Sequence, residues 1–154
     1  MIKIDIPKLS IITVCFNNRE GLRRTMESVE RQTFHDYEYI IIDGGSTDGT
    51  IDLIKENAQA PLPCGERLGE RLYWISEKDN GIYNAMNKGI KAAKGEYCYF
   101  LNSDDCIAAP NTLEKIFEKA NNADIIYGNL AISENNKAFR VGKFKKVIRF
   151  VDAY

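Results

Sequence analysis

Short apolar runs alternate with amphipathic segments along most of this chain, and that alternation constrains the fold more than any other feature. The runs, such as LSIITVCF and YEYIIID, are rich in β-branched and aromatic residues, which is typical of buried strands. In the segments between them, apolar residues recur at helical spacing with charged residues among them. The alternation predicts an α/β fold with a mainly parallel sheet, helices on both faces and right-handed crossovers.

Glycine, proline and capping residues indicate where the elements begin and end. The predicted strands are Leu9–Phe16, Tyr37–Asp43, Arg71–Ser76, Glu96–Leu101 and Asp124–Gly128. The predicted helices are Arg19–Gln32, a segment through Ile51, Leu53 and Ile54 that Ser46 or Asp48 can cap, one from Asn80 that Gly95 stops, and Pro110–Asn121. A loop is predicted over Ala58–Gly69 and a hairpin around Glu134–Lys137.

Length and charge limit the classes of protein. The 154 residues fit one domain, and a formal net charge of −1 gives no overall attraction to nucleic acid or anionic lipid. No apolar run approaches the roughly 20 residues that a membrane-spanning helix needs. The N-terminus carries acid and proline where a signal peptide would have a basic end and an apolar stretch. We therefore expect a cytoplasmic protein with no nucleic-acid partner.

The cysteines and the histidine do not suggest a metal site. None of Cys15, Cys64, Cys98 and Cys106 forms a CxxC pair, and His35 is the one histidine, so no zinc-site spacing exists. Two of the cysteines lie inside predicted strands, where a free thiol behaves as a small hydrophobe. We expect reduced, structural thiols, and a surface position for His35.

Residues 137–154 form a basic tail. Lys137–Arg149 carries no acid, and Phe144, Val147, Ile148 and Val151 fall at helical spacing opposite basic residues. We expect an amphipathic helix whose apolar side packs on protein, either this chain or a neighbouring copy in a homo-oligomer. The alternative is peripheral contact with an anionic membrane surface, here the inner membrane, although one short stripe binds lipid only marginally.

Polar residues collect where the predicted strands end. In an open parallel sheet, ligands bind outside the carboxyl ends of the strands, where strand order reverses. The first strand ends near Thr13, Phe16 and Asn17, the second at Asp43, and the fourth is followed by the NSDD run, Asn102–Asp105. Adjacent carboxylates repel each other unless a cation or hydrogen-bond donors satisfy them, and their oxygens suit magnesium or manganese. For Asp48 we prefer a capping role.

Two common phosphate-binding motifs are absent from the sequence. There is no GxGxxG after the first strand and no GxxxxGK[ST] anywhere. A site without a glycine cradle has to neutralise a diphosphate in another way, and a carboxylate-held metal ion is the obvious route.

Four segments in series now point to a family. In order and spacing, SIITVCFN, IIIDGGSTDGT, EKDNGIYNAMNKGIKAAKGEY and FLNSDD resemble the family-two inverting glycosyltransferases that build bacterial polysaccharides. The resemblance spans Ser10–Asp105 and extends weakly to Leu130. It implies a GT-A fold with a Rossmann-like sheet. It also implies that the chain binds a nucleotide-sugar donor, a UDP-sugar by preference, with divalent Mn or Mg, for transfer to a glycan or lipid-linked acceptor. GDP and dTDP remain alternatives.

The resemblance also implies residue roles. Residues 13–16 would line the base pocket, Asp43 would bond the uracil ring, and Asp104 would ligate the metal as the outer acid of a DxD motif. This chain departs from the family at Asn102 and at Gly44, where aspartate is usual. The donor-contacting residues implied are Thr13, Val14, Phe16, Asn17, Asp43, Gly45, Asp79, Asn80, Asn102, Ser103 and Asp105. We expect Lys88 and Lys91, further along the third helix, to be solvated.

The acceptor side is not represented among the motifs. Inverting transfer needs a general base, which in the resembled family is an aspartate well downstream of the DxD segment. After Leu130 the acids are Glu134 and Asp152, and neither lies in such a motif. We therefore expect a truncated donor domain, inactive alone, with the catalytic base outside it, whether the chain is a fragment or naturally short. The alternative is a non-catalytic nucleotide-binding module. A nucleotidyltransferase is disfavoured because CFNNRE is not a glycine-rich, basic loop.

Overall fold

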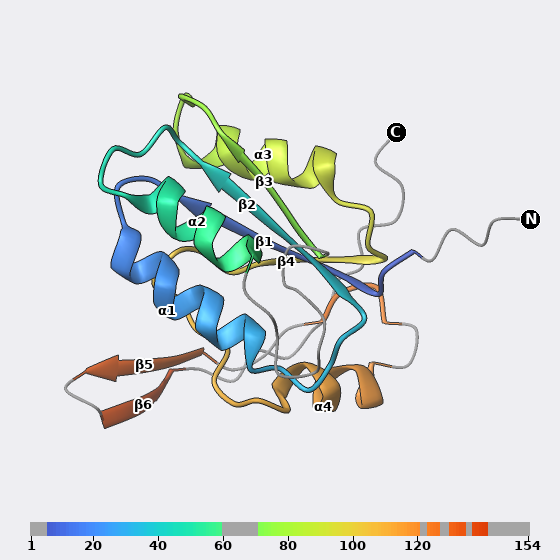
Figure 1. Cartoon of the computed structure of the whole chain (residues 1–154). Coiled ribbons are helices and arrows are strands. Elements are labelled where there is room, and N and C mark those ends of the chain that lie inside the picture. The colour runs from blue at the N-terminus through green and yellow to red at the C-terminus, as the bar shows by residue number, and fades with distance from the viewer. Residues whose placement is uncertain (1–5, 60–70, 121–122, 127–129, 135–136, 142–154) are drawn as a thin grey trace, which may run out of the picture.

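A four-stranded parallel sheet forms the centre of the computed structural model, which describes residues 6–59, 71–120, 123–126, 130–134 and 137–141 (Figure 1). Its strands are β1 (Leu9–Cys15), β2 (Tyr37–Asp43), β3 (Leu72–Ser76) and β4 (Tyr97–Phe100), in the order β3-β2-β1-β4. The β1–β2 register runs from Leu9 opposite Tyr37 to Cys15 opposite Asp43. Strand order therefore reverses between β1 and β4, which makes this the place where ligands bind in open parallel sheets.

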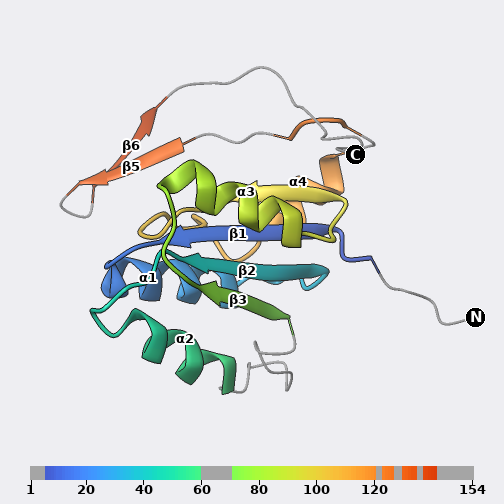
Figure 2. The same cartoon turned by 90° about the horizontal axis from the view of Figure 1, so that it is seen from above.

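Helices cover both faces of the sheet (Figure 2). The helices are α1 (Arg19–Glu30), α2 (Thr50–Gln59), α3 (Ile82–Ala92) and α4 (Thr112–Lys119). Alternate residues of β1 and β2 point to opposite faces, so Ile11 and Ile41 pack against α1, α2 and α4. Ile12 and Ile42 pack on the other side against α3. The central strands are thus buried on both faces, which explains their continuous apolar sequences.

Glycine lets α3 lie close to β1. A Cβ added at Gly89 would meet Ile12 Cγ2 at 2.4 Å, and one added at Gly95 would meet the Ser10 amide nitrogen at 2.6 Å. Both distances are below ordinary van der Waals contact, so these two positions have no room for a larger residue. The close approach fixes the position of α3 relative to the carboxyl end of β1.

The structure confirms the predicted α/β fold and most element positions to within one or two residues. Ala58, predicted as the start of a loop, instead belongs to the last turns of α2. The predicted strand at Asp124–Gly128 is wrong over residues 124–126, which form no strand, and residues 127 and 128 lie outside the described residues. The predicted hairpin is confirmed as β5 (Leu130–Glu134) paired antiparallel with β6 (Lys137–Val141).

The remaining expectations concern isolated residues. Cys15, Cys98 and Cys106 are free thiols, and Cys15 is buried in β1. His35 is exposed, as expected. Lys88 is less solvated than expected, because its Nζ lies 2.8 Å from Glu77 Oε1. Cys64 and the predicted helix from Phe144 onward lie outside the described residues. In the part of the chain that the structure describes, no helix combines the length and hydropathy required to cross a bilayer.

Candidate functional site

Asp43 ends β2 and organises the loops at the carboxyl edge of the sheet. Its Oδ2 accepts hydrogen bonds from the Gly45 and Ser46 amides at 3.1 and 3.0 Å and from Ser76 Oγ at 2.6 Å. Its Oδ1 accepts from Ser46 Oγ and from Cys15 Sγ, the latter at 3.6 Å. The donors come from β1, from β3 and from the loop after β2. One carboxylate therefore ties together three neighbouring strand ends.

The same contacts determine the ionisation of Asp43. Burial would raise the pKa of this carboxyl group, but the hydrogen bonds from Ser46, Ser76 and Gly45 outweigh burial and hold the pKa below its usual range. The residue is fully buried, at 0% exposure. A carboxylate offers about four lone-pair sites, and five donors already share them here. In this arrangement Asp43 has no free acceptor for a ligand.

Asn17 extends this network toward α1. Its backbone, in the left-handed region at φ 47°, donates from the amide to Ser46 Oγ at 2.7 Å, and its Oδ1 accepts from the Thr47 amide at 2.9 Å. Gly45, also left-handed at φ 84°, makes the turn that brings its amide onto Asp43. The predicted contacts Asn17, in the loop after β1, and Gly45, in the loop after β2, thus belong to one hydrogen-bonded network.

Asp48 has the capping role expected of it. Its Oδ1 accepts from the Thr50 amide at 3.1 Å at the start of α2. Its Oδ2 accepts from the Arg19 amide at 2.9 Å at the start of α1, so a single side chain caps two helices.

The end of β1 divides into a buried and an exposed part. Thr13 is fully buried, and its Oγ1 donates to the Leu101 carbonyl at 2.7 Å and lies 3.0 Å from Tyr39 Oη. Val14 packs in the core beneath α3. Phe16, in contrast, has 63% of its surface exposed. Of the predicted base-pocket residues, Phe16 is the one whose side chain a ligand can reach from solvent.

The NSDD run follows β4 and lies beside β1 at the point where strand order reverses. The Ser103 amide donates to the Val14 carbonyl at 3.2 Å, and Ser103 Oγ accepts from Asn18 Nδ2 at 3.3 Å. Asn102 Oδ1 is buried and has no hydrogen-bond partner in the described structure. An unpartnered buried acceptor is costly, typically about 1–3 kcal/mol, and calls for a ligand or water to satisfy it.

Asp104 is exposed in the same loop and has an uncommon backbone conformation. Its φ is 85°, and its amide donates to Thr25 Oγ1 at 2.9 Å, which holds the loop against α1. Its Oδ1 accepts two hydrogen bonds from the Arg24 guanidinium, one of them from Nε at 3.0 Å. Asp105 is exposed beside it. The run thus presents two accessible carboxylates, of which Arg24 partly neutralises one.

The donor set fits a metal ion only if other ligands complete it. Among the described residues, no three His, Cys, Asp or Glu side chains are grouped to hold a metal. Magnesium is commonly held by one or two carboxylates while phosphate and water oxygens fill the remaining positions. Asp104, with Asn102 two residues before it, fits that mode and does not form a cage made by protein alone.

Asp79 approaches the end of β2 from the connection between β3 and α3. Its Oδ1 accepts from the Gly81 amide at 2.9 Å, and its Oδ2 lies 3.0 Å from the position that a Cβ would take at Gly44. Asn80 is exposed next to it. The loop before α3 therefore belongs to the same edge of the sheet as Asp43 and Phe16.

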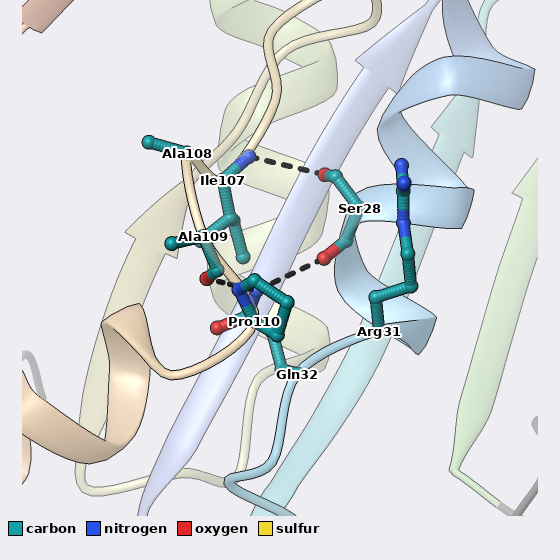
Figure 3. A pocket seen from close by; sticks show the side chains of 7 residues that line it. All are labelled: Ser28, Arg31, Gln32, Ile107, Ala108, Ala109 and Pro110. Carbon is teal, nitrogen blue, oxygen red and sulfur yellow. Dashed lines mark hydrogen bonds between the residues drawn. The ribbon is translucent and has the colours of Figure 1, made fainter.

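A small hollow lies away from these residues, between the last turn of α1 and the segment before α4 (Figure 3). Its volume is about 90 Å³, well below the roughly 300 Å³ of the smallest typical ligand pockets. Its polar groups bond to each other, since Gln32 Nε2 donates to the Ala109 carbonyl at 2.9 Å and the Ile107 amide donates to Ser28 Oγ at 3.1 Å. We assign it a packing role.

Sequence reasoning missed three residues that shape the site. Arg24 and Thr25 lie on α1 and read as ordinary amphipathic-helix positions, while Ser76 reads as the end of a strand. Each acts on a residue distant in sequence, so no local spacing could reveal it. The nearest signal is that Thr25 is a polar residue on the apolar face of α1.

This α/β domain belongs to the class of open parallel-sheet domains, in which ligands bind where strand order reverses. Its exposed acids and its unpartnered amide oxygen lie in the loop at that place. The sequence profile described as Glycosyl transferase family 2 matches residues 10–150. The chain belongs to glycosyl transferase family 2.

Individual proteins similar to this chain are also described as glycosyltransferases. The PGL/p-HBAD biosynthesis glycosyltransferase of Mycobacterium tuberculosis is 36% identical over 139 residues, which cover 88% of this chain and 51% of that protein. The putative glycosyltransferase EpsH of Bacillus subtilis is 30% identical over 129 residues, covering 83% and 35%. This chain therefore spans about half the length of the mycobacterial relative.

Solved structures show the same fold. The mannosyltransferase PcManGT from Pyrobaculum calidifontis, in complex with GDP-Man and Mn²⁺, matches 77% of this chain and 34% of its own, with a TM-score of 0.66 and 20% identity. S. aureus TarS 1-349 in complex with UDP-GlcNAc matches 77% and 33%, with a TM-score of 0.64 and 23% identity. These likenesses confirm the predicted GT-A fold.

Proposed function

We propose that this chain is the donor-binding domain of an inverting glycosyltransferase, and that it holds a nucleotide diphosphate sugar across the carboxyl ends of β1, β2 and β4. A UDP-sugar is the preferred donor, and a glycan or lipid-linked molecule is the acceptor. The TarS and PcManGT structures, which contain UDP-GlcNAc and GDP-Man with Mn²⁺, support the donor class.

The observation that carries the proposal is the buried, unpartnered Oδ1 of Asn102. It lies in the loop next to the β1–β4 reversal, where ligands of parallel sheets bind. A ribose hydroxyl is a donor of the right kind to satisfy it. The exposed ring of Phe16, at the end of the neighbouring strand, offers a face on which a base can stack.

The diphosphate fits the acidic side of the site when a cation is present. Asp104 would hold a Mn²⁺ or Mg²⁺ ion, with phosphate and water oxygens completing the coordination. When bound, such an ion neutralises the charge that develops on the departing diphosphate. Arg24, which lies against Asp104, provides a further positive charge at the same place. Asp105 is exposed and able to contact the sugar or the ion's water ligands.

Transfer itself needs groups beyond this donor site. An acceptor hydroxyl has to lose its proton to a general base as it attacks the anomeric carbon. The exposed acids described above all lie on the donor side of the proposed site. The mycobacterial relative has about twice the matched length, and we propose that the base and acceptor surface belong to the corresponding part of the whole protein.

Calorimetric titration of the 154-residue chain with UDP, GDP and dTDP, with and without Mn²⁺, tests the proposal. We expect Mn²⁺-dependent binding, with UDP the tightest. The Asp104→Ala variant should lose most of the affinity together with the metal requirement. The matched control is Asp52→Asn, which removes an exposed carboxylate from the first turn of α2 and leaves the NSDD run unchanged. If Asp104→Ala binds UDP with Mn²⁺ as tightly as the parent, the metal assignment is wrong. If none of the three nucleotides binds, the donor-site proposal is wrong.

A further inference from the structure

Asp43 and Asp79 both lie at the carboxyl end of β2, but only one of them has a free oxygen. All the acceptor capacity of Asp43 is used by donors from this chain, and the residue is fully buried. Asp79 uses Oδ1 to accept from the Gly81 amide, and its Oδ2 has no hydrogen-bond partner among the described residues. Asp79 is also partly exposed. Of the two carboxylates at the end of β2, Asp79 is the one that a ligand can reach.

That free oxygen lies next to the exposed aromatic ring. An ideal Cβ at Gly44 would be 3.0 Å from Asp79 Oδ2 and 3.2 Å from Phe16 Cδ2. Both side chains therefore approach the same point above the Gly44 backbone, so the Phe16 ring and the free Asp79 oxygen lie side by side, and the space between them is too tight for even a methyl group on residue 44. An aromatic face with a hydrogen-bond acceptor at its edge is the arrangement that holds a planar heterocycle and tests its edge.

We propose that Asp79, and not Asp43, selects the nucleobase, by accepting a hydrogen bond from a ring N–H of a base stacked on Phe16. The proposal rests on the proposed function, because it assumes that a nucleoside diphosphate occupies this edge of the sheet. Asp43 then acts as a positioning residue, which holds the loop after β2 and, through Ser76, the end of β3.

The chemistry determines which bases are accepted. Uracil, thymine and guanine carry a hydrogen on a ring nitrogen of the pairing edge, whereas cytosine has a lone pair at the equivalent position. An ionised carboxylate only accepts hydrogen bonds, so it attracts the first group and repels the lone pair of the second. A site that hydrogen-bonds one group of a ligand discriminates against an analogue that lacks this group, because the polar group of the site then loses its partner.

The first test uses the unaltered chain and probes that differ at that one hydrogen. Calorimetry in constant Mn²⁺ compares UDP with CDP and with the 5′-diphosphate of 3-methyluridine. We expect UDP to bind about tenfold or more tighter than either, the factor expected for one hydrogen bond to a charged group. Equal binding of UDP and its 3-methyl analogue overturns the proposal without any variant being made.

The second test assigns the effect to Asp79. An amide can donate as well as accept, so Asp79→Asn should bring the UDP to CDP affinity ratio to within about threefold. Glu77→Gln is the matched control, because it removes a carboxylate from the same loop, one that pairs with Lys88. This variant should keep the UDP to CDP affinity ratio of the parent. Gly44→Ala, which pushes a methyl group between the ring and the carboxylate, should lower both UDP affinity and the ratio.

The outcomes separate this inference from the proposed function. If UDP binds but Asp79→Asn, shown to be folded by its thermal transition, keeps the parental ratio, Asp79 does not select the base and the donor site stands. If no nucleoside diphosphate binds the parent, the proposed function fails and this inference fails with it. Loss of selectivity in Asp79→Asn and Gly44→Ala, but not in Glu77→Gln, supports the proposal.

Discussion

Arg24 donates hydrogen bonds from Nε and Nη2 to a single oxygen of Asp104, with the Nε contact at 3.0 Å. The same carboxylate is the proposed metal ligand, so the guanidinium and a cation compete for it. Both side chains are about half exposed, and exposed ion pairs are weak. The competition should therefore be measurable but small.

Replacing Arg24 by Gln should raise the affinity of the nucleotide-free chain for Mn²⁺ by up to about fivefold, because the competing cation is gone. Electron paramagnetic resonance of free Mn²⁺ in a titration measures this directly. Arg23→Gln is the control, since Arg23 lies one residue away and pairs with Glu20 and Glu27. Weaker Mn²⁺ binding by Arg24→Gln would show that Arg24 supports the metal loop and does not compete with the ion.

Asp43→Asn should destabilise the fold by about 2–4 kcal/mol. The asparagine side chain has the same shape as aspartate, but an NH2 group replaces one carboxylate oxygen. That NH2 group would face the backbone N–H groups of Gly45 and Ser46, which leaves buried donors unpaired. Urea unfolding followed by circular dichroism measures the change. Asp52→Asn, on the exposed side of α2, should stay within about 0.5 kcal/mol of the parent. A similarly small effect for Asp43→Asn would mean that the hydrogen-bond network is not what holds the loop.

The same carboxylate predicts a pH dependence. Its pKa is lowered in the folded chain, so the unfolded state binds more protons. The stabilisation is present above the unfolded pKa of about 3.9 and is lost as pH falls through the lower, folded value. The free energy of unfolding should therefore fall below about pH 4, and part of that fall should be absent in Asp43→Asn. Parallel pH profiles of the two proteins would contradict this prediction.

Cys15 and Cys106 should differ sharply in reactivity. Burial and the nearby Asp43 charge raise the pKa of the Cys15 thiol far above its ordinary value, so little thiolate forms. Cys106 is exposed. In native protein at pH 8, iodoacetamide should modify Cys106 first and Cys15 only after unfolding, as read by peptide mass spectrometry. Early modification of Cys15 would show that the end of β1 opens readily.

The strands could be predicted because β1 and β2 are buried on both faces and therefore carry unbroken apolar sequences. The segment at Asp124–Ile126 shows the limit of that argument. Its apolar residues look like a strand, but a strand forms only where the backbone pairs with a neighbouring strand, and local composition does not report that pairing.

The site divides in the same way. The position of Asp43 at a strand end follows from the alternation of apolar runs and helical segments. That its oxygens are already occupied by hydrogen bonds does not follow, because the donors Cys15 and Ser76 come from other strands. Asp79 was expected among the donor-contacting residues from the resemblance. Its proximity to Gly44 depends on how the loop after β3 folds back, which no spacing in the sequence reveals.

The left-handed backbone of Asp104 has a consequence for protein engineering. A left-handed conformation costs a residue with a Cβ about 1 kcal/mol or more of conformational energy, although aspartate tolerates it better than most residues. Glycine adopts the same conformation without that cost. Glycine at this position would also keep the amide that bonds Thr25. A screen that rewards thermostability alone would therefore favour the very substitution that deletes the proposed metal ligand. Directed evolution of this domain therefore needs a selection for ligand binding as well as for thermostability. Selection for thermostability alone would increase stability while it removes the proposed metal ligand.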